Sequence, residues 1–178
     1  ASGAKNIIGF DRKGAINKKR ESSDEMRQWF IDHCNSEQFN GSLSEAMNGA
    51  DIFIGVSAPN VLKEDDIQSM AQKAIVFALS NPDPEIDPEI ARKYATVVAT
   101  GRSDHPNQIN NVLAFPGIFR GLLDANASKI TDELLVAAAD AIASCVAPAQ
   151  LNANFIIPSV FDPEVAKKVA AAVKGAAK

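Results

Sequence analysis

Side-chain amides after two apolar segments are the residues best suited to chemistry in this chain. Asn81 follows the apolar run at residues 74–79, and Asn110 and Asn111 lie in the loop after a second run at residues 95–99. A side-chain amide can donate to a carboxylate and accept from a hydroxyl, so it can orient a ligand without adding charge. The pattern favours a neutral pocket for carboxylate or nucleotide groups. Nearby Asn107 is attributed to local turn formation.

The apolar runs that precede these amides have the character of strands. Residues 74–79 end in Ser-Asn-Pro and residues 95–99 end in Thr-Gly-Arg, while a third run at 51–56 ends beside Gly55 and Ser57. Strands that stop at amides and glycines are typical of the carboxyl edge of a parallel sheet, where open α/β proteins bind ligands. Gly55 would allow a ligand to approach the backbone closely, although a simple turn explains it equally well.

An acid near the amino terminus is a candidate for nucleotide binding. The apolar run 5–10 is expected to be a strand, and it ends at Asp11. In dinucleotide-binding folds such an acid accepts hydrogen bonds from the adenosine ribose, but a solvated acid in a turn fits the spacing equally well. The carboxylate would repel the 2′-phosphate of NADP and so favour NAD. Arg12 and Lys13 could neutralise that repulsion, which leaves the choice of cofactor open.

Capping residues and helical spacing predict helices over residues 24–34, 41–48, 60–72, 111–124, 131–146 and 162–174, with Pro116-Gly117 interrupting the fourth.

Residues 83–89 contain four carboxylates, Asp83, Glu85, Asp87 and Glu89. Prolines among them favour turns and a helix start, with Asp87 as the cap and Pro88 in the first position, over a metal site. His33 is interpreted as a structural or exposed histidine, and His105 has no paired ligand at metal-binding spacing. Trp29 and Phe30 are expected to pack.

Composition places the chain among ordinary globular proteins. It has 178 residues, 46% of them hydrophobic, and a net charge of -4. This size suits one domain, and the mild acidity argues against nucleic-acid or anionic-membrane partners. Cys34 and Cys145 are expected to be reduced, because no secretory signal or membrane-spanning run accompanies them. A cytoplasmic protein is expected.

Several motifs together resemble one enzyme family. The segments SNPDPE (80–85), TGRSDHPNQINN (100–111) and FPGIFRG (115–121) are similar to the carboxyl-terminal, nucleotide-binding domain of bacterial malic enzymes, in the same order and spacing. FDRKG at residues 10–14 matches the same family, and the likeness extends over nearly the whole chain.

The resemblance implies an α/β fold, a Rossmann-like doubly wound and mostly parallel sheet, with residues 1–178 forming one truncated domain. The first βα unit is expected to be missing, because the chain contains no G-x-G-x-x-G fingerprint. That fingerprint should precede Ala1, which is not methionine, so a fragment or processed product is expected. Residues 1–3 would then end the preceding helix or its loop.

The resemblance also implies a function: oxidation of malate to oxaloacetate with reduction of NAD or NADP, then decarboxylation to pyruvate and CO2. It assigns substrate contacts to Asn81, Asn110 and Asn111. It assigns cofactor contacts to Asp11, Ser57, Ala58, Asn81 and Asn111. The family's lysine–tyrosine acid–base pair and the ligands of its Mg or Mn ion belong to the missing amino-terminal portion. The isolated chain is therefore expected to be inactive, and a nucleotide-binding fragment or interaction module without catalysis is the alternative.

Loss of the first strand would leave unpaired edges in the middle of the sheet. Association with an amino-terminal portion, or self-association into a homo-oligomer, is therefore expected.

Overall fold

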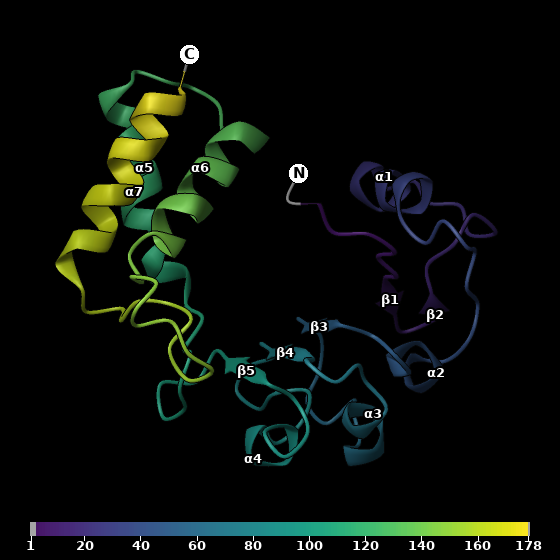
Figure 1. Ribbon diagram of the computed structural model, residues 1–178. Coiled ribbons are helices and arrows are strands. Elements are labelled where there is room, and N and C mark those ends of the chain that lie inside the picture. The colour runs from purple at the N-terminus through teal and green to yellow at the C-terminus, as the bar shows by residue number, and fades with distance from the viewer. Residues whose placement is uncertain (1–2, 178) are drawn as a thin grey trace.

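A parallel sheet in the middle of the chain positions the predicted amides. The computed structural model describes residues 3–177. Its strands β3 (Ile52–Gly55), β4 (Ile75–Ala78) and β5 (Val97–Thr100) form a three-stranded parallel sheet in the order β3-β4-β5. These strands confirm the three predicted in this region, and the α/β class with them (Figure 1). Because they run parallel, their carboxyl ends lie along one edge.

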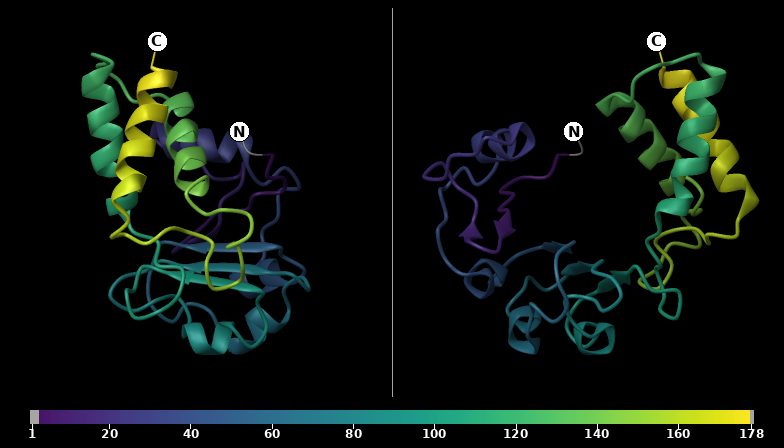
Figure 2. Two further views of the ribbon diagram at one scale, coloured as in Figure 1. Left: turned by 60° about the vertical axis from the view of Figure 1, so that its left-hand side comes forward. Right: turned by 180° about the vertical axis from the view of Figure 1, so that it is seen from behind.

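Short helices cover one face of this sheet. α3 (Glu64–Gln68) and α4 (Pro88–Ala91) lie on that side, whereas the amino-terminal hairpin and the carboxyl-terminal helices stand on the other (Figure 2). The core between them contains Met47, Leu62, Ile67, Met70, Ala74, Val76, Ala78, Ile86, Ala91, Ala95 and Val98. On the opposite face of β3, Ile52 and Ile54 are 54% and 63% exposed. The sheet is therefore covered fully on one face only.

The helix predicted over residues 60–72 is shorter than expected. Asn60 N–H donates to Pro84 O at 3.1 Å, and Leu62 N–H donates to Glu85 O at 3.0 Å. These bonds tie the segment to the loop after β4, so α3 begins only at Glu64. Asp87 accepts from the first turn of α4, which confirms the predicted cap. Asp24, Ser42, Thr131 and Asp162 cap α1 (Glu25–His33), α2 (Leu43–Met47), α6 (Asp132–Ala143) and α7 (Pro163–Ala176) in the same way.

The carboxyl-terminal third forms a bundle of α5 (Phe115–Asp124), α6 (Asp132–Ala143) and α7 (Pro163–Ala176). The prediction that Pro116-Gly117 interrupts a helix is wrong. A 3-10 turn, η1 (Asn111–Leu113), precedes α5, and Pro116 lies in the first turn of α5, where its missing N–H costs nothing. No helix in the described part of the chain is long and apolar enough to cross a bilayer.

The amino-terminal region differs most from expectation. Instead of a strand over residues 5–10, β1 (Phe10–Asp11) and β2 (Gly14–Ala15) form a small antiparallel hairpin. Within residues 3–177 no strand runs beside residues 5–9, and the carbonyls of Ile7 and Gly9 accept from the chain at Asn35 and Ile16 instead. Residues 1–2, expected to end a helix or its loop, lie outside the described residues.

Helices α1 (Glu25–His33) and α2 (Leu43–Met47) complete this region. Phe30 packs against Gly9, as predicted, but Trp29 is 53% exposed and stacks on His33 with a centroid distance of 4.6 Å. His33 Nδ1 also lies 2.7 Å from Trp29 O, and the side chain is exposed, as the prediction of a structural or exposed histidine allows. Cys34 and Cys145 are both free thiols.

Close packing of α5 on α7 depends on Gly117. A Cβ atom there would lie 2.5 Å from Val169 Cβ and 2.8 Å from Ala166 O, which is backbone and cannot move aside easily. We expect Gly117→Ala to lower the free energy of unfolding by about 1–3 kcal/mol because of overpacking. Gly175→Ala is the matched control, since nothing lies within 4 Å of its Cβ position and alanine favours a helix by about 1 kcal/mol. Urea unfolding measures both; equal effects would contradict the packing argument.

Candidate functional site

The loops at the carboxyl edge of the sheet bring most of the predicted residues together. Ser57 and Ala58 follow β3, Asn81 follows β4, and Gly101 follows β5. Gly55, Ala78 and Thr100 are paired across the three strands, so the loops start level with one another. Ser57, Ala58 and Asn81 are all exposed. The edge is therefore accessible to a ligand.

Asn81 lies against Gly101. A Cβ atom at Gly101 would be 3.1 Å from Asn81 Oδ1, so glycine leaves room for the amide. Asn81 Nδ2 donates to Leu79 O at 3.3 Å, and within residues 3–177 its Oδ1 atom accepts no hydrogen bond. This oxygen is consequently available to a donor on a ligand.

The amide-rich loop extends the same edge. Ile109 N–H donates to Thr100 O at 2.8 Å, and Gln108 forms a parallel bridge with Thr100. Asn110 Oδ1 accepts from Val112 N–H at 3.0 Å and caps η1. The NH2 group of Asn110 is therefore the part of the amide that can donate to a ligand. Asn111 is exposed.

Asn107 does more than form a local turn, so that prediction is wrong. Its Nδ2 donates to Val98 O at 3.0 Å and to Ala153 O at 2.8 Å, and its Oδ1 accepts from Ile156 N–H at 3.0 Å. The side chain is buried and joins β5 to a distant segment. Asn107 thus holds the start of the amide-rich loop against the carboxyl-terminal region.

The sequence pattern places Glu85 among turn-forming and capping carboxylates, but in the structure its side chain is 0% exposed and bonds to two loops of the site. Its Oε1 accepts from Ser57 N–H at 2.9 Å and its Oε2 accepts from Ser80 N–H at 3.0 Å. A Cβ atom at Gly55 would be 2.4 Å from Glu85 Cδ, so the glycine makes room for this side chain. Gly55 at the strand end was the one sequence signal of the arrangement.

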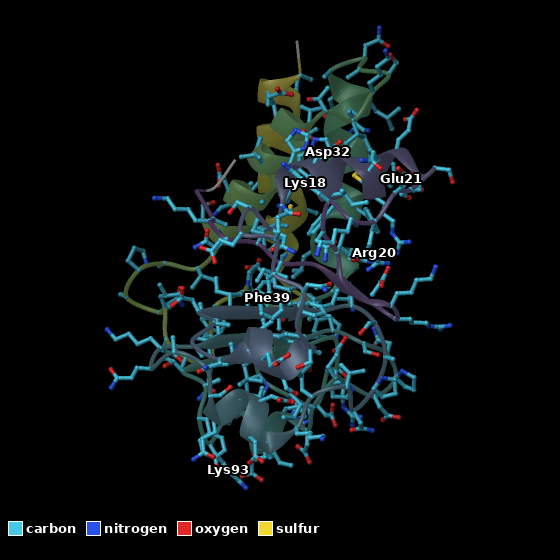
Figure 3. All side chains as sticks on the ribbon, turned by 90° about the vertical axis from the view of Figure 1, so that its right-hand side faces the viewer. Lys18, Arg20, Glu21, Asp32, Phe39 and Lys93 are labelled. Carbon is cyan, nitrogen blue, oxygen red and sulfur yellow. The ribbon has the colours of Figure 1, made fainter. Side chains whose placement is uncertain are left out.

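Asp11 lies in the hairpin with two arginines. Its Oδ2 accepts from Arg20 at 2.6 Å and from Arg27, and its Oδ1 accepts from Lys13 N–H at 2.8 Å. The hydrogen bond from Arg20 is the main reason that the pKa of Asp11 lies below its usual value. The expected neutralising side chains of Arg12 and Lys13 form no ion pair with it in the described structure. Figure 3 shows Arg20 beside the hairpin, far from Lys93 at the opposite end of the molecule.

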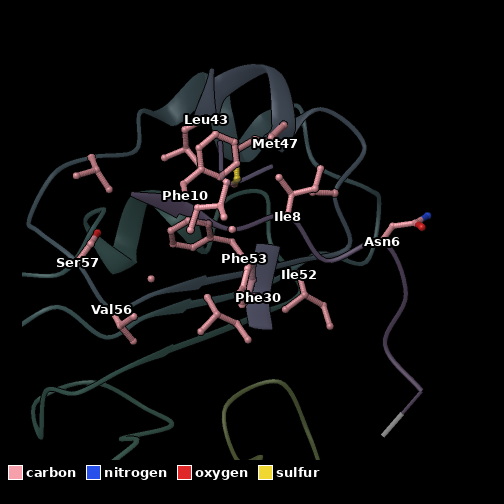
Figure 4. Close-up of a pocket in the computed structure, with 17 residues that line it drawn as sticks. Asn6, Ile8, Phe10, Phe30, Leu43, Met47, Ile52, Phe53, Val56 and Ser57 are labelled. Carbon is pink, nitrogen blue, oxygen red and sulfur yellow. The ribbon is translucent and has the colours of Figure 1, made fainter. Parts of the chain in front are cut away.

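A groove of about 450 Å³ separates the amino-terminal region from β3. Its walls are mainly apolar, and Ser57 lies on its rim (Figure 4). Lining residues include Ile8, Phe10, Phe30, Ile52, Phe53 and Ser57. Asn81, Asn110 and Asn111 do not line this groove, so the amides form a separate part of the site along the sheet edge.

His105 contacts charged residues near α4. Its Nδ1 lies 3.4 Å from Arg92 Nη1 and 3.6 Å from Glu89 Oε1. Across residues 3–177 no group of three or more His, Cys, Asp or Glu side chains is arranged to hold a metal ion.

The parallel sheet, with exposed amides at its carboxyl edge, belongs to the class of α/β nucleotide-binding domains. The family model for "Malic enzyme, NAD binding domain" matches residues 1–178, so the chain belongs to this family. The resemblance inferred from the motifs is thereby confirmed.

Characterised relatives agree with this assignment. The chain is 54% identical to the NAD-dependent malic enzyme of Geobacillus stearothermophilus, covering 99% of the chain and 37% of that protein. It is 46% identical to an NADP-dependent malic enzyme of Rhizobium meliloti, covering 97% and 24%. The crystal structure of the Thermotoga maritima NAD-dependent malic enzyme superposes with a TM-score of 0.89 at 46% identity, covering 97% of this chain and 46% of that one. The chain thus spans less than half the length of these relatives.

Acid should weaken the ion pairs of Asp11. The pKa of Asp11 is lower in the folded chain than in the unfolded chain. Its ion pairs therefore contribute their full stability above the unfolded pKa of about 3.9, and this contribution is lost as the pH falls through the pKa of the folded chain. We expect the difference in unfolding free energy between the wild type and Asp11→Asn to shrink between about pH 5 and pH 2. Urea unfolding at several pH values measures it.

The control for this experiment is the same comparison in an Arg20→Ala, Arg27→Ala background, where the pH-dependent part should become smaller, because only the hydrogen bond from Lys13 N–H remains to lower the pKa of Asp11. A difference that stays constant from neutral pH to acid would contradict the pairing.

Proposed function

We propose that this chain is the dinucleotide- and substrate-orienting part of an NAD(P)-dependent malic enzyme. The parent enzyme would oxidise malate to oxaloacetate and decarboxylate it to pyruvate and CO2. The observation that supports this most is the alignment of Ser57, Asn81 and the loop at residues 108–111 along one carboxyl edge. In open α/β sheets this edge is where the cofactor binds.

The adenosine half of the dinucleotide is assigned to the hairpin side. Asp11 would accept from the ribose hydroxyls, and Ser57 with Ala58 would lie beside the dinucleotide backbone. Arg20 and Arg27 offset the charge of Asp11, which reduces its repulsion of a 2′-phosphate. Relatives named NAD-dependent and NADP-dependent are both similar to this chain. Either cofactor therefore fits the proposal.

Malate and the reacting half of the cofactor are assigned to the amides. The NH2 groups of Asn81, Asn110 and Asn111 would donate to a malate carboxylate. The amide oxygens of Asn81 and Asn111 would accept from the nicotinamide ribose; that of Asn110 is already used as a cap. The bound nicotinamide supplies the hydride acceptor. The protein's part is to hold the malate carbon in line for transfer without adding charge.

The acid–base pair and the Mg or Mn ligands are proposed to lie in the additional length that the relatives possess. Turnover would then require that portion, and the isolated chain would bind the dinucleotide without reacting. An inactive nucleotide-binding module remains the alternative and is distinguished by turnover after the missing portion is added. A cytoplasmic location stays a prediction.

Replacing the amides tests the substrate assignment in the full-length enzyme. Each of Asn81→Ala and Asn111→Ala should lower kcat/KM for malate by about tenfold to a hundredfold, the effect of losing a hydrogen bond to a charged group. Asp11→Ala should act differently and raise KM for the dinucleotide. Asn48→Ala, an exposed amide at the end of α2, is the control. Steady-state dinucleotide reduction measures all four, and unchanged turnover in both amide variants would refute the assignment.

The groove beside β3 is the proposed binding place of a further strand, supplied by the additional length that the relatives possess. β3 is the edge of the sheet, so its outer backbone groups have no strand partner among the described residues. Across the groove lie Ile8 and Phe10, and parallel sheets are normally buried on both sides. An apolar, extended strand from the amino-terminal portion of the enzyme would cover both walls.

This partner proposal predicts that the chain binds its amino-terminal portion as a defined complex. Ile54→Lys should weaken that complex, because it places a charge on the exposed part of β3. Ile130→Lys is the control, since Ile130 is also about half exposed but lies in the loop before α6. Light scattering of the mixed portions measures the mass. Self-association into a homo-oligomer would appear as a multiple of the chain mass, and a stable compact monomer that ignores the added portion would contradict the proposal.

A further inference from the structure

One buried carboxylate connects the two loops assigned to the dinucleotide. Glu85 is 0% exposed, and its two oxygens accept from different loops: Oε1 from Ser57 N–H at 2.9 Å and Oε2 from Ser80 N–H at 3.0 Å. Ser57 begins the loop after β3, and Ser80 immediately precedes Asn81 in the loop after β4. The side chain therefore spans the ends of two neighbouring strands.

The position of Glu85 is fixed by its surroundings. Its backbone carbonyl accepts from Leu62 N–H at 3.0 Å, while Gly55 leaves the space through which its side chain passes. No salt bridge reaches the carboxylate in the part of the chain that is described. Burial of a polar group is costly unless hydrogen bonds replace those with water, and here two backbone N–H groups do so.

We propose that Glu85 is a positioning residue for the dinucleotide. It sets the spacing between the Ser57-Ala58 loop and the Ser80-Asn81 loop without touching the ligand. This inference rests on the proposed function, which assigns dinucleotide contacts to both loops. A carboxylate is required because both of its oxygens accept, whereas a glutamine of the same shape presents an NH2 group to one of the two N–H donors.

Asp66 provides a matched buried acid. It is 6% exposed, and its Oδ2 accepts from Lys63 N–H at 2.7 Å at the start of α3. α3 packs on the covered face of the sheet, and the carboxylate of Asp66 accepts from Lys63 N–H at the start of its own helix, not from Ser57 or Ser80. Loss of this acid should affect stability but not the spacing of the loops.

The experiment compares Glu85→Gln with Asp66→Asn in the full-length enzyme. Fluorescence titration with NADH and NADPH gives the Kd, thermal unfolding gives Tm, and hydrogen exchange reports on the Ser57 and Ser80 amides. Glu85→Gln should raise the Kd at least about tenfold, because the two loops would no longer be held at the spacing that the dinucleotide needs, and it should speed exchange at Ser57 or Ser80. Asp66→Asn should lower Tm while the Kd stays within about twofold of the wild type.

Glu85→Asp is the second variant if glutamine prevents folding. It keeps the charge but is one methylene shorter, so it cannot reach both amides, and a similar rise in Kd is expected. An unchanged Kd in a folded Glu85 variant would overturn the inference, as would an equal loss of affinity in Asp66→Asn. If the wild type itself binds neither dinucleotide, the proposed function fails. Unchanged exchange at both serine amides would separately overturn the inference that Glu85 holds the two loops together.

Discussion

The parallel register of β3, β4 and β5 is the constraint on which the rest of the structure depends. It places Gly55, Ala78 and Thr100 in one row, so that loops far apart in the sequence begin at the same edge. Under the proposed function the loops need fixed spacing as well as proximity, because the dinucleotide would contact several of them at once. Glu85 and Asn107 supply that spacing with buried side chains that bond to backbone groups in other segments. Such bonds are stable because both partners are removed from water.

Charge is distributed so that the two halves of the candidate site differ. Around Asp11 the arginines hold a carboxylate in a charged, hydrogen-bonded cluster. Along the sheet edge Asn81, Asn110 and Asn111 present neutral amides. This contrast suits a ligand whose ribose hydroxyls bind at one end and whose reacting carbon must be oriented at the other. The apolar groove between them is bounded by a sheet edge without a strand partner.

Sequence patterns predicted the site where the relevant signals are local. The strand ends and their following amides were found because apolar runs and turn residues adjoin one another along the chain. The strand over residues 5–10 is absent except at Phe10, and the helix over residues 60–72 is shorter than predicted, because backbone groups in both segments bond to other parts of the chain. Glu85 and the Arg20–Arg27 pair were missed for the same reason, since each acts on a residue well separated from it in the sequence.

The sequence by itself determined the α/β class, the family, the three parallel strands and the helix caps, because hydrophobic periodicity and capping are properties of neighbouring residues. Only the tertiary structure decided which side chains meet. In the sequence Glu85 is one of four clustered acids, but in the structure it accepts hydrogen bonds from two different loops. Asn107 has the pattern of a turn residue, but its side chain bonds to β5 and to the segment at residues 153–156. Burial and long-range hydrogen bonding depend on how the strands are placed in space, and a linear pattern does not contain that information.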